Sequence, residues 1–206
     1  MKKLFFYILS LLFSFCCILN AQQISVPYEC GFEDSAEVGN WILNAGANGP
    51  KCQDQWMVGN LDNNGGFNSM YISCDTGKTT TYGAKPNVVV AYRTVEVNSS
   101  NSVIVDCSFD WKCVGAKGIS ELKFYMLPEN FLGSESELVS SHTSATLPRA
   151  LRTMPPSATL SDSESWQYWS SSIAGNTFTL SPGEKWYMVF IWENKNKTVS
   201  KSYLIF

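Results

Sequence analysis

Apolar and polar side chains alternate along several stretches of the chain, most regularly at residues 103–114. One set of alternate positions holds Val103, Val105, Cys107, Phe109, Trp111 and Cys113. The other set holds Asp106, Ser108, Asp110 and Lys112. Successive side chains of a β-strand point to opposite faces, so a period of two indicates a strand. We expect residues 103–114 to form a sheet strand with one face on the core and the other in solvent.

Two other segments show strand patterns. Residues 121–127 place Leu122, Phe124 and Met126 on one face, and Pro128 ends the run. Residues 186–192 are apolar on both faces, which indicates a central strand. Shorter strands are expected at residues 28–32, 56–58, 70–74, 88–97, 166–173 and 177–180.

Polar turn sequences separate these strands, at residues 62–66, 75–78, 98–101 and 181–183. Many short strands joined in this way indicate an antiparallel β-sandwich. A short helical turn is expected only near 134–139. Residues 134–172 stand apart, with 16 Ser or Thr among 39 residues, and are expected to form a long excursion that is either mobile or functional. We therefore predict a single all-β domain over residues 22–206.

The first 21 residues have the three parts of a secretory signal peptide. Two lysines precede 14 apolar residues within 4–19, and Ala21 supplies a small residue at the break. A membrane anchor is the alternative, but about 20 apolar residues are needed to span a bilayer. A lipoprotein signal would need a small residue just before its cysteine. We expect cleavage before Gln22 and export to the cell surface, the extracellular space or the periplasm, with no transmembrane span left.

Export makes the cysteines candidates for disulfide bonds, which persist in oxidising compartments. Five remain after the signal: Cys30, Cys52, Cys74, Cys107 and Cys113. The number is odd, and four paired cysteines would leave three connectivities open. On one strand face Cys107 and Cys113 would lie roughly 20 Å apart, too far for a bridge. We predict that Cys107, in mid-strand, is unpaired and that two bridges join the other four.

Composition and charge narrow the class of partner. The formal net charge is −3, and it becomes −5 once Lys2 and Lys3 leave with the signal. Nucleic-acid binding needs clustered Lys and Arg, so we expect no nucleic-acid partner. A chain with 45% hydrophobic and 14% aromatic residues can bury a full core and is not expected to be disordered.

Several short motifs, in this order, resemble those of exported bacterial domains. Residues 28–34 (YECGFED), followed by Trp41, are similar to the opening of MAM-type jelly rolls, where a Phe-Glu pair precedes a Trp. The motifs QWMVG at 55–59, NNGG at 63–66, SMYIS at 69–73, AYR at 91–93 and SFDWK at 108–112 resemble the choice-of-anchor J domains. These in turn look like the cleaved adhesin domains of gingipain-type proteins. The resemblance spans about residues 28–192.

This resemblance implies a jelly-roll β-sandwich that a Gram-negative bacterium exports for adhesion or glycan contact. It also implies a structural Ca²⁺, with Glu33 matching the family's first-strand carboxylate and Asp34 as a second one. Family members complete the site with an Asp-Asn pair near the domain's end, for which Glu193 and Asn194 are approximate substitutes here. Calcium takes six to eight oxygen ligands, so one Glu cannot hold it. The alternative is that Glu33 and Asp34 form a solvated strand end.

Few residue patterns in the chain match those that a catalytic site requires. The one histidine, His142, lies in a polar loop without a nucleophile elbow, whereas a Ser-His-Asp site needs a held imidazole. No C-x-x-C pair follows the signal, so zinc is not expected. Asp106 and Asp110 share a strand face, where a solvated polar face is the ordinary interpretation rather than a glycosidase carboxylate pair. We expect a protein that is not an enzyme.

A binding module fits the composition better. The chain has seven Trp, and the best candidates for exposed aromatics are Trp166, Tyr168 and Trp169, next to the Ser-rich segment. Sugars stack on aromatic rings and hydrogen-bond to Asp, Asn and Lys. We therefore predict an adhesin-like module that contacts a glycan or a cell-surface protein through these aromatics with Asp106 and Asp110. Two alternatives stay open: that the aromatics clamp the excursion onto the sandwich, and that the protein is a structural or protein-contact subunit of a surface assembly.

Overall fold

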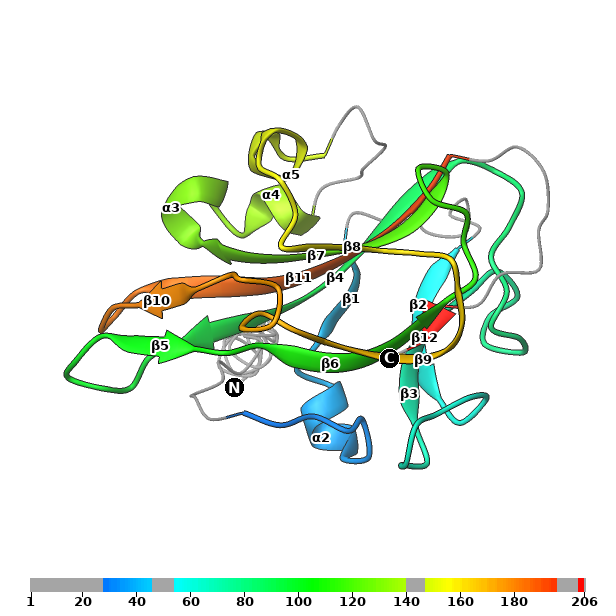
Figure 1. Cartoon of the computed structure of the whole chain (residues 1–206), viewed down its shortest axis with the longest axis horizontal. Helices are drawn as coiled ribbons and strands as arrows, with labels where there is room; N and C mark the ends of the chain where they lie inside the picture. The colour runs from blue at the N-terminus through cyan, green and yellow to red at the C-terminus, as the bar shows by residue number, and fades with distance from the viewer. Residues whose placement is uncertain (1–27, 46–53, 140–146, 196–203, 206) are drawn as a thin grey trace, which may run out of the picture.

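The computed structural model describes residues 28–45, 54–139, 147–195 and 204–205. These residues form antiparallel sheets with a few short helices, which confirms the predicted all-β class (Figure 1). The helices are α2 (Ser35–Val38), α3 (Glu129–Leu132), α4 (Ser136–Val139) and α5 (Arg149–Thr153). The predicted signal at 1–21 lies outside the described residues, as do Cys52 and His142. Within the described ranges, no helix has the length and apolar character needed to cross a membrane.

The first sheet has five strands in the order β1-β4-β11-β7-β8. Their bounds are Ile42–Ala45 for β1, Asn87–Glu96 for β4, Lys185–Asn194 for β11, Ser120–Pro128 for β7 and Ala158–Leu160 for β8. The strand β11 pairs with β4 on one side and β7 on the other, so the predicted central strand at 186–192 is confirmed. It needs apolar side chains on both faces because Phe190 and Trp192 enter one apolar cluster while Tyr187 and Val189 enter another.

Short helices cover the outer face of this first sheet. Leu132 of α3, Leu138 of α4 and Leu151 of α5 belong to the same apolar cluster as the outer side chains of β11. Figure 1 shows the three helices on one side of the sheet. The segment 134–172, predicted as an excursion, therefore holds two helices that cover a sheet. It also holds two strands that belong to sheets, β8 and β9 (Ser163–Ser170).

The second sheet has the order β2-β3-β12-β6-β9. Its strands are β2 (Gln55–Gly59), β3 (Ser69–Ser73), β12 (Leu204–Ile205), β6 (Ser108–Cys113) and β9 (Ser163–Ser170). The predicted strands at 56–58 and 70–74 correspond to β2 and β3, and the one at 166–173 to the second half of β9. The strand β12, from the end of the chain, lies between β3 and β6.

The predicted strand at 103–114 is divided in two. Its first part, β5 (Val103–Val105), pairs with β10 (Phe178–Leu180), and its second part, β6, pairs with β9. Between them, Ser171 donates its backbone N–H to the carbonyl of Cys107 (2.8 Å), and its hydroxyl accepts the N–H of Cys107 (3.0 Å). The segment changes its partner strand at this point. The predicted alternation of inward and outward side chains nevertheless continues across the break, and the apolar positions on both sides of it pack on the core.

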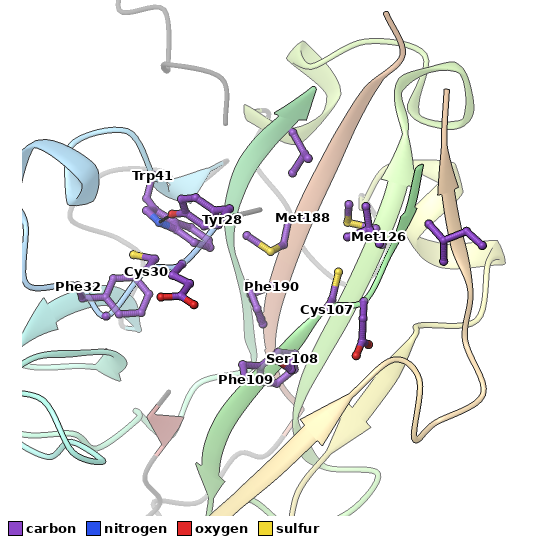
Figure 2. A pocket seen from close by; sticks show the side chains of 16 residues that line it. Tyr28, Cys30, Phe32, Trp41, Cys107, Ser108, Phe109, Met126, Met188 and Phe190 are labelled. Carbon is purple, nitrogen blue, oxygen red and sulfur yellow. Dashed lines mark hydrogen bonds between the residues drawn. The ribbon is translucent and has the colours of Figure 1, made fainter. Parts of the chain in front are cut away.

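The expected strand at 28–32 does not form. Residues 28–31 have no strand partner in the described structure, and Phe32 has a positive φ of 60°, which turns the chain away from an extended path. The segment is instead held by α2. Arg93 of β4, only 1% exposed, forms a two-pronged ion pair with Glu37 of α2 (3.1 and 3.2 Å). Figure 2 shows Tyr28, Phe32 and Trp41 beside the strands that this segment covers.

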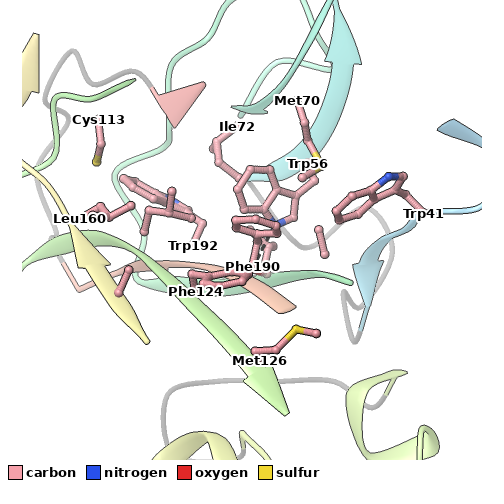
Figure 3. Close-up of a cluster of buried hydrophobic side chains, with 14 of the residues drawn as sticks. Trp41, Trp56, Met70, Ile72, Cys113, Phe124, Met126, Leu160, Phe190 and Trp192 are labelled. Atoms are coloured by element: carbon pink, nitrogen blue, oxygen red, sulfur yellow. Dashed lines mark hydrogen bonds between the residues drawn. The ribbon is translucent and has the colours of Figure 1, made fainter. Parts of the chain in front are cut away.

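The main apolar core lies between the two sheets (Figure 3). Trp56 of the second sheet and Trp192 of the first are almost fully buried within it. Trp56 donates its indole N–H to the carbonyl of Val89 (3.2 Å), and Trp192 donates to the carboxylate of Asp54 (3.3 Å). Both buried indoles thus have hydrogen-bond acceptors. Phe124, Phe190, Met70 and Ile72 pack around them.

Candidate ligand-binding face of β6 and β9

The pairing of β6 with β9 sorts the predicted binding residues onto two sides of the second sheet. Asp110 lies opposite Tyr168, and Phe109 lies opposite Trp169. Because side chains alternate along a strand, the first pair shares one face and the second pair shares the other. Phe109 and Trp169 pack against the core, so Asp110 and Tyr168 are on the outer face.

Trp169 lies on the core side and not on the outer face. Its ring stacks on that of Phe109, with centroids 5.1 Å apart and 29° between the planes. It also meets the ring of Phe124 edge-on, with centroids 5.2 Å apart. Trp169 therefore fits the alternative interpretation, in which an aromatic side chain holds the segment against the sandwich. We leave Trp169 out of the candidate site.

The outer face combines aromatic rings with polar groups. Tyr168 is 60% exposed, and Trp166 is half-buried beneath the ammonium of Lys112, whose Nζ lies 5.5 Å from the ring centroid. Lys112 forms an ion pair with Asp62, and Asn64 donates its amide N–H to Asp110 (3.0 Å). We call the group Asp62, Asn64, Asp110, Lys112, Trp166 and Tyr168 the β6–β9 face.

Glu33 holds the loop that supplies two members of this face. Its carboxylate accepts the backbone N–H groups of Phe67 (2.6 Å) and Asn68 (2.9 Å) and the side-chain amide of Asn68 (2.9 Å). These hydrogen bonds favour the ionised form and lower the pKa of Glu33. The loop approaches closely at Gly66, where an added Cβ would lie 2.5 Å from the Glu33 oxygen Oε1. Glu33 therefore positions the loop that carries Asp62 and Asn64.

The two predicted calcium ligands thus have protein partners. Asp34 is the N-cap of α2 and accepts the backbone N–H of Ala36 (2.8 Å). Glu193 forms an ion pair with Lys123 inside the first sheet, and Asn194 donates to the carbonyl of Gly83 (2.8 Å). Among the described residues, no group of three or more His, Cys, Asp or Glu is placed to hold a metal ion.

Asp106, another predicted binding residue, lies at the break between β5 and β6. It accepts hydrogen bonds from the hydroxyl of Ser171 (2.5 Å) and from the backbone N–H (3.0 Å) and hydroxyl (2.9 Å) of Ser172. These bonds lower the pKa of Asp106 and keep it ionised at neutral pH. Its carboxylate joins the strand break to the turn after β9.

Free thiols replace the predicted disulfides. Cys107 is unpaired as expected, but Cys30, Cys74 and Cys113 are free as well, so the prediction of two bridges among the other four cysteines is wrong. These three residues occupy different surroundings: Cys30 is half-buried in the segment before α2, Cys74 is exposed in a turn, and Cys113 is buried at the end of β6. The spacing of the cysteines along the chain could not show that they lie in different surroundings.

Three members of the β6–β9 face, Asp62, Asn64 and Lys112, were not predicted as binding residues. Asp62 and Asn64 stood out in the sequence only as parts of a turn, and Lys112 as one position of an alternating strand. Their meeting depends on strand register and on the Glu33 contact, which join residues more than 30 positions apart. No protein-family model matches this chain, and a comparison with curated proteins found no significant relative.

Proposed function

We propose that this chain is an exported, non-catalytic binding module of the jelly-roll type, adhesin-like, that contacts glycans or other cell-surface ligands through the β6–β9 face. The observation that supports it is the exposed ring of Tyr168 directly opposite the carboxylate of Asp110. An aromatic platform with a carboxylate, an amide and an ammonium at its edge offers both kinds of contact that a sugar uses.

The chemistry of the face suits a neutral, hydroxyl-rich ligand. The C–H face of a sugar ring can lie on Tyr168, because the aromatic ring offers a large apolar contact area. This contact costs little conformational entropy, because a tyrosine side chain has few rotatable bonds. Asp110 and Asn64 can accept and donate hydrogen bonds to ring hydroxyls. The charges of Lys112 and Asp62 are already paired, so a neutral ligand need not neutralise them.

A glycan array probed with the labelled protein tests this function. We expect defined glycans to bind, and we expect Tyr168→Ala to weaken binding by about tenfold or more, as loss of a central aromatic contact does. The matched control is Phe131→Ala on α3, because Phe131 is also 60% exposed but lies among the helices that cover the other sheet.

Two results would contradict the glycan proposal: no glycan bound, or equal affinity in the wild type and the Tyr168→Ala variant. The alternative function is a structural or protein-contact subunit of a surface assembly. It would be favoured if the array stays blank and a purified surface protein binds in a manner that Tyr168→Ala, but not Phe131→Ala, weakens.

Calcium bound at Glu33 and Asp34 belongs to the same proposal. A cation there would lie beside the loop that carries Asp62 and Asn64 and would reinforce its position. A ligand that binds only the folded state raises stability by about 2.7 kcal/mol at a hundredfold excess over its Kd. Thermal melting with calcium and then with excess chelator tests it: a shift that Glu33→Gln abolishes supports the site, and identical midpoints remove it.

A further inference from the structure

An apolar cavity of about 730 Å³ opens between the two sheets, away from the β6–β9 face (Figure 2). Strands β4, β7 and β11 of the first sheet contribute Val95, Met126, Met188 and Phe190 to its wall. Phe109 of β6 faces them from the second sheet. A pocket of this size and lining has the properties of sites that take small apolar ligands.

Residues 28–32, before α2, form a second wall and are not part of any sheet in the described structure. Trp41, after α2, and residues 104–108, where β5 is followed by β6, complete the lining. Figure 2 shows Tyr28, Cys30 and Trp41 across the cavity from Met126. The hydroxyl of Tyr28 donates to Glu37 and accepts the indole N–H of Trp41 (3.2 Å). Glu37 is in turn held by the buried Arg93. This wall is therefore anchored by a network of polar contacts, and the cavity is preformed.

The charged side chains that line the cavity are both acidic. They are Glu29 and Asp106, each exposed to solvent, and among the described residues no Lys or Arg lines the cavity. The hydrogen bonds from Ser171 and Ser172 keep Asp106 ionised, as described above. Ile104, 76% exposed, extends the apolar lining to the surface beside Asp106. The entrance thus joins apolar surface to negative charge.

We propose that this cavity binds a cationic amphiphile: an alkyl chain that enters between Met126, Met188 and Phe190 and carries an ammonium group held at the entrance by Glu29 and Asp106. An anionic chain of the same length would place its charge against two carboxylates, so the cavity discriminates against fatty-acid-like ligands. The proposal does not depend on the function of the β6–β9 face.

The test compares n-decylammonium with n-decanoate, both below their micellar concentrations, as competitors of the neutral fluorescent probe N-phenyl-1-naphthylamine bound to the purified protein. We expect the ammonium compound to displace the probe at a concentration at least tenfold lower. Glu29→Gln should weaken the ammonium compound by about 2- to 5-fold, the effect of one exposed ion pair. Glu164→Gln, an exposed acidic position on β9 that does not line the cavity, is the matched control.

Thiol labelling locates the bound chain independently of the probe. Cys30 and Cys107 line the cavity, whereas Cys74 is exposed and does not line it. Burial raises the pKa of Cys107 to about 12, so its thiol reacts slowly, and Cys30 is the reporter. We expect n-decylammonium to slow maleimide labelling of Cys30 several-fold and to leave Cys74 unchanged, as read by mass spectrometry of peptides. Equal displacement by n-decanoate, or no protection of Cys30, would overturn the proposal.

Discussion

Glu33 illustrates how much one exposed side chain can organise. Its carboxylate accepts three N–H groups from residues 67 and 68, more than 30 positions away, and so fixes the loop that reaches the β6–β9 face. The loop can come this close because residue 66 is glycine. The residue that the family resemblance implies as a calcium ligand is, in this structure, a hydrogen-bond acceptor that joins two distant segments.

The charge of Glu33 should therefore stabilise the fold in a pH-dependent way. Its pKa is lowered in the folded protein, so its contribution is present above the unfolded pKa, near 4.5, and is lost as the pH falls through the lower folded value. We expect Glu33→Gln to lower the urea midpoint at pH 7 and to have little effect at the acid end. Unfolding curves across pH 3–7 measure this, and a constant difference at every pH would contradict it.

Gly115 is a second position where adding one side-chain atom is expected to change the stability of the fold. A Cβ at this residue would lie 2.2 Å from the backbone oxygen of Ser120, and that carbonyl cannot rotate away as a flexible side chain could. We expect Gly115→Ala to lower the free energy of unfolding by about 1–3 kcal/mol, the cost typical of overpacking. Gly31→Ala is the control, because its nearest neighbouring atom would be 3.8 Å away. Equal stability of the two variants would show that the segment relaxes.

At the level of elements, a short helix is placed by a buried ion pair. The four-residue helix α2 has no buried residue of its own and is too short to be stable alone. Arg93 of β4 binds both oxygens of Glu37 and also donates to the carbonyl of Asn40 (3.1 Å). This contact attaches the helix, and with it one wall of the cavity, to the first sheet.

Removing Arg93 should release this segment. We expect Arg93→Met to lower the free energy of unfolding by about 3–5 kcal/mol, because it leaves Glu37 without its cation in a half-buried place. Adding Glu37→Gln should recover part of that loss, since the unpaired charge is then gone. Chemical denaturation and hydrogen exchange at α2 measure both effects, with the exposed Arg152→Met as control. A loss no larger than that of the control would show that the ion pair does not hold the helix.

For the whole molecule, one contribution to the pH dependence of stability comes from a buried carboxylate. Asp54 is fully buried and accepts hydrogen bonds from the backbone N–H of Gly83 (2.6 Å) and the indole of Trp192. Burial outweighs these bonds and raises the pKa of Asp54 to about 6. A raised carboxyl pKa means that the folded state binds the proton more tightly, so this residue favours folding as the pH falls from above 6 towards 4.

Substituting Asp54 should remove this pH dependence. In the wild type we expect Asp54 to add on the order of 2 kcal/mol to the free energy of unfolding between pH 7 and pH 4, before Glu33 and Asp106 lose their charges. Asp54→Asn keeps an acceptor for Gly83 but does not titrate, so its stability should vary less over this range. Thermal or urea unfolding of both proteins at closely spaced pH values measures the difference, and parallel profiles would contradict the assignment.

The order of the residues was enough to predict the all-β class, the central strand β11 and the inward and outward faces of residues 103–113. These features follow from the period of the apolar side chains, which the backbone geometry of a strand converts directly into faces. Long-range contacts were needed to show that this segment divides at Asp106 and Cys107, and that Trp169 lies in the core while Tyr168 is exposed. They also leave Cys30, Cys74 and Cys113 free, so two bridges cannot join the four cysteines. Each of these depends on register and on contacts such as Ser171 with Cys107, between residues far apart in the chain. A local pattern shows which way a side chain points, but its neighbours are set by how the whole chain pairs.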